Sequence, residues 1–149
     1  MVYITKGADE TKALGAKLAT MLSNGEIAGK FIAMRGEMGV GKTVFTSGFA
    51  SYFGITGVKS PTYTVVNQYG NDTKIYHFDM YRIADEDDLY SVGYDDYINS
   101  DGYIIVEWSE NIPYAIPDDA IFVTIERITD DDEKRKVTIE TLRKDADSK

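Results

Sequence analysis

The sequence predicts an α/β fold in which a mixed central sheet contains antiparallel hairpins. Two observations lead to this prediction. Short apolar runs typical of buried strands alternate with segments that repeat their apolar residues at helical spacing. In addition, two pairs of strand-like segments are separated only by short polar turns, which favours hairpins. Helix-connected strands together with hairpins require a mixed sheet rather than a purely parallel one.

The first predicted element is a helix that runs from Asp9 to about Ser23. Leu14, Leu18 and Leu22 recur every four residues and so share one face. The carboxylate of Asp9 is suited to cap the first turn. An Asn-Gly pair directly after Ser23 is suited to end the last turn.

A glycine-rich loop lies between the next two predicted elements, a buried strand over residues 31–34 and a helix from Lys42 to about Phe53. Residues 36–43 read G-E-M-G-V-G-K-T and match the phosphate-binding pattern G-x-x-x-x-G-K-S/T. In such a loop the backbone N–H groups and the N-terminus of the following helix bind phosphate oxygens. Strand, loop and helix together predict a P-loop NTPase-like fold with three layers.

The expected nucleotide contacts in this loop come from seven consecutive residues, Glu37, Met38, Gly39, Val40, Gly41, Lys42 and Thr43. Lys42 would reach the β- and γ-phosphates of ATP, and Thr43 would place its hydroxyl on Mg²⁺. A chance match to the pattern occurs in about one in a hundred sequences of this composition. The competing interpretation is a glycine-rich turn with an incidental lysine.

Five further strand-like segments and one broken helix complete the predicted domain. The strand-like segments are residues 62–69, 74–79, 103–108, 120–127 and 136–142. The first two and the last two of these pair as hairpins, and the middle one is apolar enough to be a buried strand. A helix over residues 85–99 is interrupted near Gly93. We expect a single P-loop ATPase domain over residues 1–143 and a flexible C-terminal tail at 144–149.

Composition limits the kinds of function that the chain can have. It has no cysteine, which excludes disulfides and thiolate metal sites. Its net charge of −9 argues against direct electrostatic binding of DNA or RNA. No basic and apolar leader opens the sequence, and no apolar run approaches the roughly 20 residues that span a membrane. We therefore expect a cytoplasmic protein without membrane association.

A carboxylate suited to a metal is expected at the end of a buried strand. Glu107 follows the apolar run 103–106, so it should project from the carboxyl edge of the sheet, where open α/β sheets bind ligands. The alternative is an ordinary strand-end acid in a salt bridge. His77 and Asp79 share one face of their strand, which fits either a functional pair or a plain polar sheet edge.

Two more positions allow two interpretations each. Thr62, in the segment Ser60-Pro61-Thr62, either senses Mg²⁺ or the γ-phosphate from a switch loop or belongs to a turn that the proline fixes. Trp108 fits an aromatic wall of the site as well as it fits the core, and spacing does not separate the two.

Taken in order, these motifs resemble the TsaE (YjeE-type) family, the bacterial ATPases needed for threonylcarbamoyladenosine modification of tRNA. The resemblance extends to about Leu142. Its landmarks are Glu10-Thr11, Leu14-Gly15, the phosphate loop, Ser60-Pro61-Thr62-Tyr63-Thr64, His77-x-Asp79-x-Tyr81-Arg82 and Glu107-Trp108-x-Glu110. Each short motif is common by itself, whereas the ordered set together with a phosphate loop is specific.

The resemblance implies roles for the candidate catalytic residues. Thr43 and Glu107 would hold Mg²⁺, while Lys42 binds the phosphates. Thr62 would be a switch-like threonine. Asp79 would act near the attacking water or the metal. The expected catalytic residues are thus Lys42, Asp79, Glu107 and Thr62.

The resemblance also implies nucleotide contacts outside the loop and two partner proteins. Thr11 matches a family position near the bound nucleotide, and Arg135, where the match is loose, would also reach it. The family acts with TsaB and TsaD, which carry out the threonylcarbamoyl transfer, so tRNA would be met only through that complex. ATP hydrolysis would be slow alone and stimulated by these partners.

Two other functions also fit a phosphate loop. A small-molecule kinase usually needs a lid with arginines, and no pair of the chain's arginines within a short loop looks like such a lid. A module that senses nucleotide without hydrolysing it is the non-enzymatic alternative, and slow turnover by the isolated chain would not separate it from an ATPase. A GTPase is disfavoured, because no Asn/Thr-Lys-x-Asp stretch is present.

Overall fold

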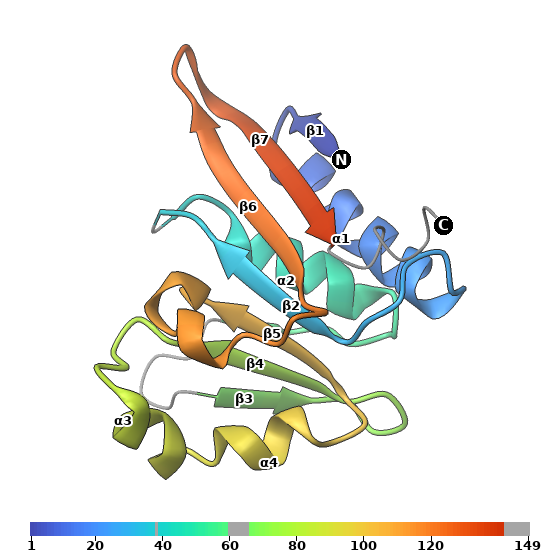
Figure 1. Cartoon of the computed structure of the whole chain (residues 1–149). Helices are drawn as coiled ribbons and strands as arrows, with labels where there is room; N and C mark the ends of the chain where they lie inside the picture. Colours follow the sequence, from blue (N-terminus) through green and yellow to red (C-terminus); the bar gives the residue numbers. More distant parts are fainter. Residues whose placement is uncertain (38, 60–65, 142–149) are drawn as a thin grey trace, which may run out of the picture.

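The computed structural model describes residues 1–37, 39–59 and 66–141. The strands are β1 (Val2–Thr5), β2 (Phe31–Arg35), β3 (Val66–Tyr69), β4 (Ile75–Asp79), β5 (Tyr103–Glu107), β6 (Ile121–Ile128) and β7 (Asp131–Thr141). Within the described residues they form one seven-stranded sheet in the order β1-β7-β6-β2-β5-β4-β3 (Figure 1).

The centre of this sheet is parallel and its two sides are antiparallel. β2 pairs in parallel with both β5 and β6, and β4 pairs in parallel with β5. β3 and β4 form one antiparallel hairpin, β6 and β7 form another, and β1 adds to β7. The predicted mixed sheet with antiparallel hairpins is therefore confirmed.

Helices cover both faces of the sheet. They are α1 (Ala8–Ser23), α2 (Lys42–Ser51), α3 (Glu86–Ser91), α4 (Tyr94–Ile98) and the 3₁₀ turns η1 (Ser109–Asn111) and η2 (Pro113–Ala115). α1 and α2 share a buried cluster with Ile32 of β2, whereas α3 and α4 share the other cluster with its neighbour Ala33. Because successive strand residues point to opposite faces, the two helix pairs lie on opposite sides of the sheet. This confirms the three layers.

α1 and α2 approach each other backbone to backbone. A Cβ added at Gly15 would lie 2.1 Å from the carbonyl oxygen of Phe45, and one added at Gly48 would lie 1.8 Å from the carbonyl oxygen of Lys12. Neither position has room for a side chain unless a helix moves. This contact sets the orientation of α2, and α2 begins with Lys42. None of the described helices is long and apolar enough to cross a membrane.

The structure corrects three predicted boundaries. α1 begins at Ala8 with Gly7 at its N-cap, so the prediction that Asp9 caps the helix is wrong. Asp9 lies in the first turn, where a negative charge suits the helix dipole. α2 ends at Ser51, before the predicted end. β7 begins at Asp131 instead of residue 136, because pairing with β6 continues through charged residues that carry no apolar pattern.

β1 has no counterpart among the predicted elements. It is a four-residue edge strand that pairs with β7, and the ammonium group of Met1 donates to the carbonyl of Ile139, 138 positions away, at 2.9 Å. Such long-range pairing leaves no local pattern. The predicted interruption near Gly93 is confirmed, since this residue is left-handed (φ 76°) between α3 and α4. The predicted tail at 144–149 lies outside the described residues.

Candidate active site at the phosphate loop

The glycine-rich loop connects β2 to α2, as predicted. Gly36 (φ 148°) and Gly41 (φ 121°) adopt backbone conformations that other residues rarely adopt. A Cβ at Gly36 would also lie 2.6 Å from the carbonyl oxygen of Ile125 on β6. These two glycines therefore let the loop fold tightly against the neighbouring strand and enter the first turn of α2.

Two arginines of the β6–β7 hairpin lie against this loop. Arg135 of β7 donates through Nε to the carbonyl of Val40 at 2.9 Å. Arg127 is its register partner on β6, and a Cβ added at Gly39 would lie 3.4 Å from Nη2 of Arg127. Arg135 is thus beside the phosphate loop, where it was expected. Arg127 carries no sequence signal for this place, because only the register of the hairpin puts it beside the loop.

The remaining predicted loop contacts are placed as follows. Glu37 is exposed, and its carbonyl accepts a hydrogen bond from the N–H of Val40 at 3.3 Å. Met38 lies outside the described residues. Thr11 of α1 is buried and its methyl group lies 3.8 Å from where a Cβ of Gly41 would be. The hydroxyl groups of Thr11 and Thr5 are hydrogen bonded at 2.7 Å. Thr11 therefore adjoins the loop.

Lys42 is buried although it is charged, with only 4% of its surface exposed. Its Nζ donates to the carbonyl of Gly36 at 2.6 Å and lies 4.1 Å from the centre of the Trp108 ring. Burial lowers the pKa of Lys42, and the nearby carboxylate of Glu107 is the largest influence in the opposite direction. The ammonium group is therefore already partly shielded from water at the loop.

Trp108 forms part of the site because its backbone is held in an unusual conformation. It follows β5 with φ 59°, the only positive φ of a non-glycine residue in the described chain. The hydroxyl of Ser109 donates to the carbonyl of Met34 at 3.1 Å, and the side chain of Asn111 donates to that of Met80 at 2.9 Å. These bonds tie the segment to β2 and to the residue that follows β4. Trp108 is thus an aromatic wall over Lys42 that also packs at the edge of the core.

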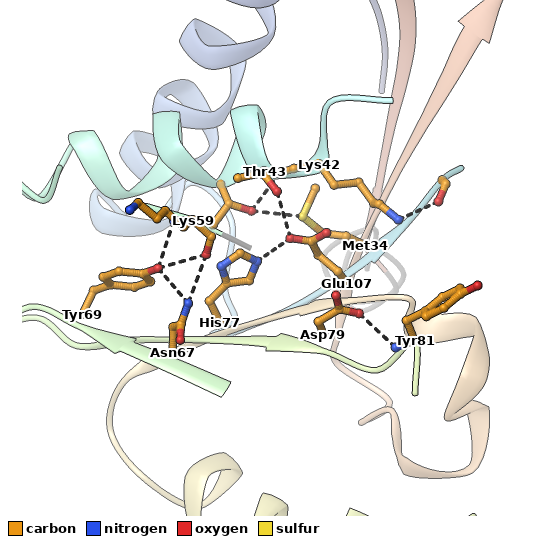
Figure 2. A network of polar contacts seen from close by, with 12 residues as sticks. Met34, Lys42, Thr43, Lys59, Asn67, Tyr69, His77, Asp79, Tyr81 and Glu107 are labelled. Atoms are coloured by element: carbon orange, nitrogen blue, oxygen red, sulfur yellow. Dashed lines mark hydrogen bonds and ion pairs between the residues drawn. The ribbon is translucent and has the colours of Figure 1, made fainter. Parts of the chain in front are cut away.

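Glu107 meets Thr43 and His77 at the carboxyl ends of the parallel strands (Figure 2). The hydroxyl of Thr43, in the first turn of α2, donates to Oε2 of Glu107 at 3.4 Å. Nε2 of His77 lies 2.5 Å from the same oxygen. The carboxylate is buried, with 4% exposure. Glu107 thus forms a buried pair with His77 and also faces the phosphate loop, while its role as a metal ligand stays a prediction.

Asp79 lies beside Glu107, because the two residues are register partners on β4 and β5. Its Oδ1 accepts the backbone N–H of Tyr81 at 2.9 Å, and the Tyr81 ring lies 5.0 Å from that of Trp108. Burial raises the pKa of Asp79, and the charge of Glu107 adds to that rise, whereas the Tyr81 hydrogen bond opposes it. The structure thus brings Lys42, Thr43, Asp79 and Glu107 together. Thr62 lies outside the described residues.

The donor set at this point suits a hard cation that also binds phosphate. Thr43 and Glu107 offer a hydroxyl and a carboxylate oxygen, which are ligand types that Mg²⁺ accepts. Among the described residues no group of three or more His, Cys, Asp or Glu side chains could hold a metal alone. Mg²⁺ usually binds through one or two protein ligands together with phosphate oxygens and water.

A phosphate loop between a parallel strand and a helix, with a carboxylate at the end of the adjacent strand, defines the class of this chain as a P-loop-type α/β protein. A family model described as "Threonylcarbamoyl adenosine biosynthesis protein TsaE" matches residues 5–137. The chain belongs to the TsaE family.

Relatives and a solved structure agree with this assignment. The chain is 35% identical over 136 residues to the tRNA threonylcarbamoyladenosine biosynthesis protein TsaE of Bacillus subtilis, covering 90% of this chain and 81% of that one. It is 43% identical over 101 residues to the protein of that name from Haemophilus influenzae, covering 66% and 64%. The crystal structure of YdiB from Bacillus superposes with a TM-score of 0.79 at 28% identity, covering 99% of this chain and 89% of that one.

Proposed function

We propose that this chain is a cytoplasmic Mg²⁺-dependent ATPase of the bacterial tRNA N6-threonylcarbamoyladenosine modification complex and supports turnover of its TsaB and TsaD partners. The family name supports the pathway. One observation carries the ATPase assignment: Thr43 and Glu107, 64 positions apart, meet at 3.4 Å beside the phosphate loop. The chain is acidic, so it meets tRNA only through its partners and binds neither DNA nor a membrane.

The loop and Lys42 bind the triphosphate. Backbone N–H groups of residues 39–43 and the N-terminus of α2 provide donors and a favourable dipole for phosphate oxygens. Lys42 exchanges the carbonyl of Gly36 for the β- and γ-phosphates. Because Lys42 is already buried, its charge acts in a medium of low polarity and binds phosphate more strongly than an exposed lysine would. Thr11 and Arg135 contribute nucleotide contacts from beside the loop.

Thr43 and Glu107 would hold Mg²⁺ against the phosphates. When bound, Mg²⁺ supplies positive charge that offsets the charge developing on the transferred phosphoryl group. Asp79 adjoins Glu107 and either orients the attacking water or contacts the metal. Thr62 acts as the switch threonine that responds to loss of the γ-phosphate. Turnover is slow in the isolated chain, and binding of the partners completes the site.

The test is Mg²⁺-dependent ATP hydrolysis by the purified chain, alone and with TsaB and TsaD of the same organism. We expect marked stimulation by the pair, and a loss of at least about a hundredfold in Lys42→Ala and in Glu107→Ala. Glu140→Ala is the matched control, because it removes an exposed glutamate of β7 whose register partner, Phe122, lies near the end of β6 opposite to Arg127 and the loop. It should retain full stimulated activity.

Three outcomes would overturn this proposal. Full partner-stimulated turnover in Lys42→Ala or Glu107→Ala would show that ATP hydrolysis does not need the residue replaced. Tight ATP binding and proven complex formation without any stimulation would identify a nucleotide-sensing module. Phosphoryl transfer to a small acceptor faster than to water would identify a kinase.

A further inference from the structure

His77 is a buried polar residue whose side chain makes one hydrogen bond. It lies on β4 with none of its surface exposed, and Nε2 lies 2.5 Å from Oε2 of Glu107 on β5. His77 is the register partner of Ile105, two residues before Glu107. Since residues two apart on a strand share a face, the imidazole reaches along the sheet toward the strand end where the loop lies.

The second ring nitrogen, Nδ1, has no hydrogen-bond partner, and it is the only buried side-chain nitrogen or oxygen in the described residues of which this holds. An unpaired buried polar atom is destabilising by about 1–3 kcal/mol. An apolar side chain would avoid that penalty, as Ile75 does on the same face of β4. The hydrogen bond that the imidazole makes is with Glu107. The presence of a histidine here is therefore better explained by that carboxylate than by packing.

His77 and Thr43 hold the same oxygen of Glu107 from two elements. The hydroxyl of Thr43 comes from α2, and the imidazole comes from β4 (Figure 2). A carboxylate only accepts hydrogen bonds, so in this pair Nε2 of His77 donates to Oε2 of Glu107. Side-chain rotation of Glu107 away from Thr43 would break the bond to His77. The imidazole therefore restricts the carboxylate to the conformation that faces the phosphate loop.

We propose that His77 is a positioning residue for Mg²⁺ binding: it orients Glu107 so that this carboxylate and the Thr43 hydroxyl converge on one cation beside the phosphate loop. The inference rests on the proposed function, because it takes Glu107 and Thr43 as the metal-binding pair. Hydrogen-bond partners that orient metal ligands typically contribute about 10–100-fold to metal affinity. His77 does not touch the nucleotide in this account, so its effect is specific to the metal.

The test measures metal affinity directly, without turnover. Mn²⁺ is titrated into protein held in molar excess over a non-hydrolysable ATP analogue, and free Mn²⁺ is followed by electron paramagnetic resonance. In His77→Leu we expect affinity about 10–100-fold weaker than in the native chain. In His77→Gln, whose amide nitrogen can reach the position of Nε2, we expect most of the affinity to return. Binding of the analogue in EDTA should be the same in all variants.

Phe78→Leu is the matched structural control. Phe78 is the next residue on β4, is equally buried and faces the opposite side of the sheet. It should lower the free energy of unfolding in urea but leave Mn²⁺ affinity unchanged. If His77→Leu does not fold, His77→Asn replaces it, because the shorter amide does not reach Glu107. If His77→Asn then binds Mn²⁺ at least about tenfold more weakly than His77→Gln, the proposal is supported. Equal Mn²⁺ affinities of these two variants would overturn it.

Glu107→Ala separates failure of this inference from failure of the proposed function. If Glu107→Ala binds Mn²⁺ as tightly as the native chain, the metal site itself is wrongly placed and both proposals fall. If Glu107→Ala loses Mn²⁺ but His77→Leu binds it normally, the metal site stands and His77 has no positioning role.

Discussion

The two faces of β4 differ in the side chains that they carry. Ile75, His77 and Asp79 point toward the face that α1 and α2 cover, and they end at the phosphate loop. Tyr76 and Phe78 point to the other face, where their rings pack edge-to-face or tilted against Tyr94 and Tyr97 of α4. Leu89 of α3 belongs to the same buried cluster. One strand thus carries the polar chemistry on one side and aromatic packing on the other.

The helices on the two faces differ correspondingly. α1 and α2 have 16 and 10 residues and meet at two glycines with no room for side chains, so their spacing is set by backbone atoms. α3 and α4 have 6 and 5 residues; α3 packs through Leu89 and α4 through the rings of Tyr94 and Tyr97. We infer from this difference that the positions of Lys42 and Thr43 depend on backbone contact between α1 and α2. The face that α3 and α4 cover, called the aromatic face below, contributes stability, and its side chains can be replaced by other apolar ones at a smaller loss. The following predictions test this contrast.

The largest effect is expected at the helix contact. Gly48→Ala places a Cβ 1.8 Å from the carbonyl oxygen of Lys12, a backbone atom that only a helix shift can move. We expect the free energy of unfolding in urea to fall by about 3 kcal/mol or more. Gly7→Ala is the control, because no atom lies within 4 Å of its Cβ position. A loss of less than about 1 kcal/mol in Gly48→Ala would show that α1 and α2 adapt easily.

A smaller effect is expected on the aromatic face. Phe78→Leu removes the ring that packs against Tyr94 and Tyr97 at 5.6 and 5.3 Å. We expect the free energy of unfolding to fall by about 1–2 kcal/mol, because the core of this face can partly close over a smaller apolar side chain. ATP affinity, measured by calorimetry, should stay unchanged. A matching loss of ATP affinity would mean that the aromatic face also positions the site.

The smallest effect is expected at Tyr94. Its hydroxyl donates to the carbonyl of Ala115 at 2.9 Å, so Tyr94→Phe should lower the free energy of unfolding by about 1 kcal/mol at neutral pH. Burial raises the pKa of Tyr94 above its ordinary value. The folded chain therefore keeps this proton where the unfolded chain loses it, and stability falls as pH rises above about 10.

The difference in the free energy of unfolding between the native chain and Tyr94→Phe should depend on pH, which makes this prediction sharper. Urea unfolding of the native chain and the variant, compared at pH 7 and above pH 10, should show their difference shrinking and then reversing as pH rises. A constant difference across that range would show that the Tyr94 hydroxyl is not protected by burial.

The fold and the loop were predictable because their signals are local. The sequence of residues 36–43 is enough to predict the shape of the loop, because a phosphate loop needs its glycines, lysine and threonine at fixed spacing. Buried strands such as β2 and β5 are short apolar runs. β1 and the charged part of β7 were not predictable, because they become strands only through pairing with each other or with β6.

The candidate site was predicted residue by residue but not as an arrangement. Glu107 and Asp79 were selected from strand ends, yet their pairing follows from the parallel register of β4 and β5, which no local pattern contains. The bond from His77 to Glu107 and the place of Arg127 beside Arg135 depend on the same kind of information. Trp108 could be assigned only from its left-handed backbone, which places its ring over Lys42.

The central claim is that Thr43 and Glu107 form one metal site with the bound triphosphate. The most direct measurement is a crystal structure with Mn²⁺ and a non-hydrolysable ATP analogue, using the anomalous signal of manganese. We predict one anomalous peak between the Thr43 hydroxyl and the Glu107 carboxylate, on the side of the β- and γ-phosphates, with His77 still bonded to Glu107. A manganese peak held by phosphate alone, with Glu107 turned away from it, would contradict the claim.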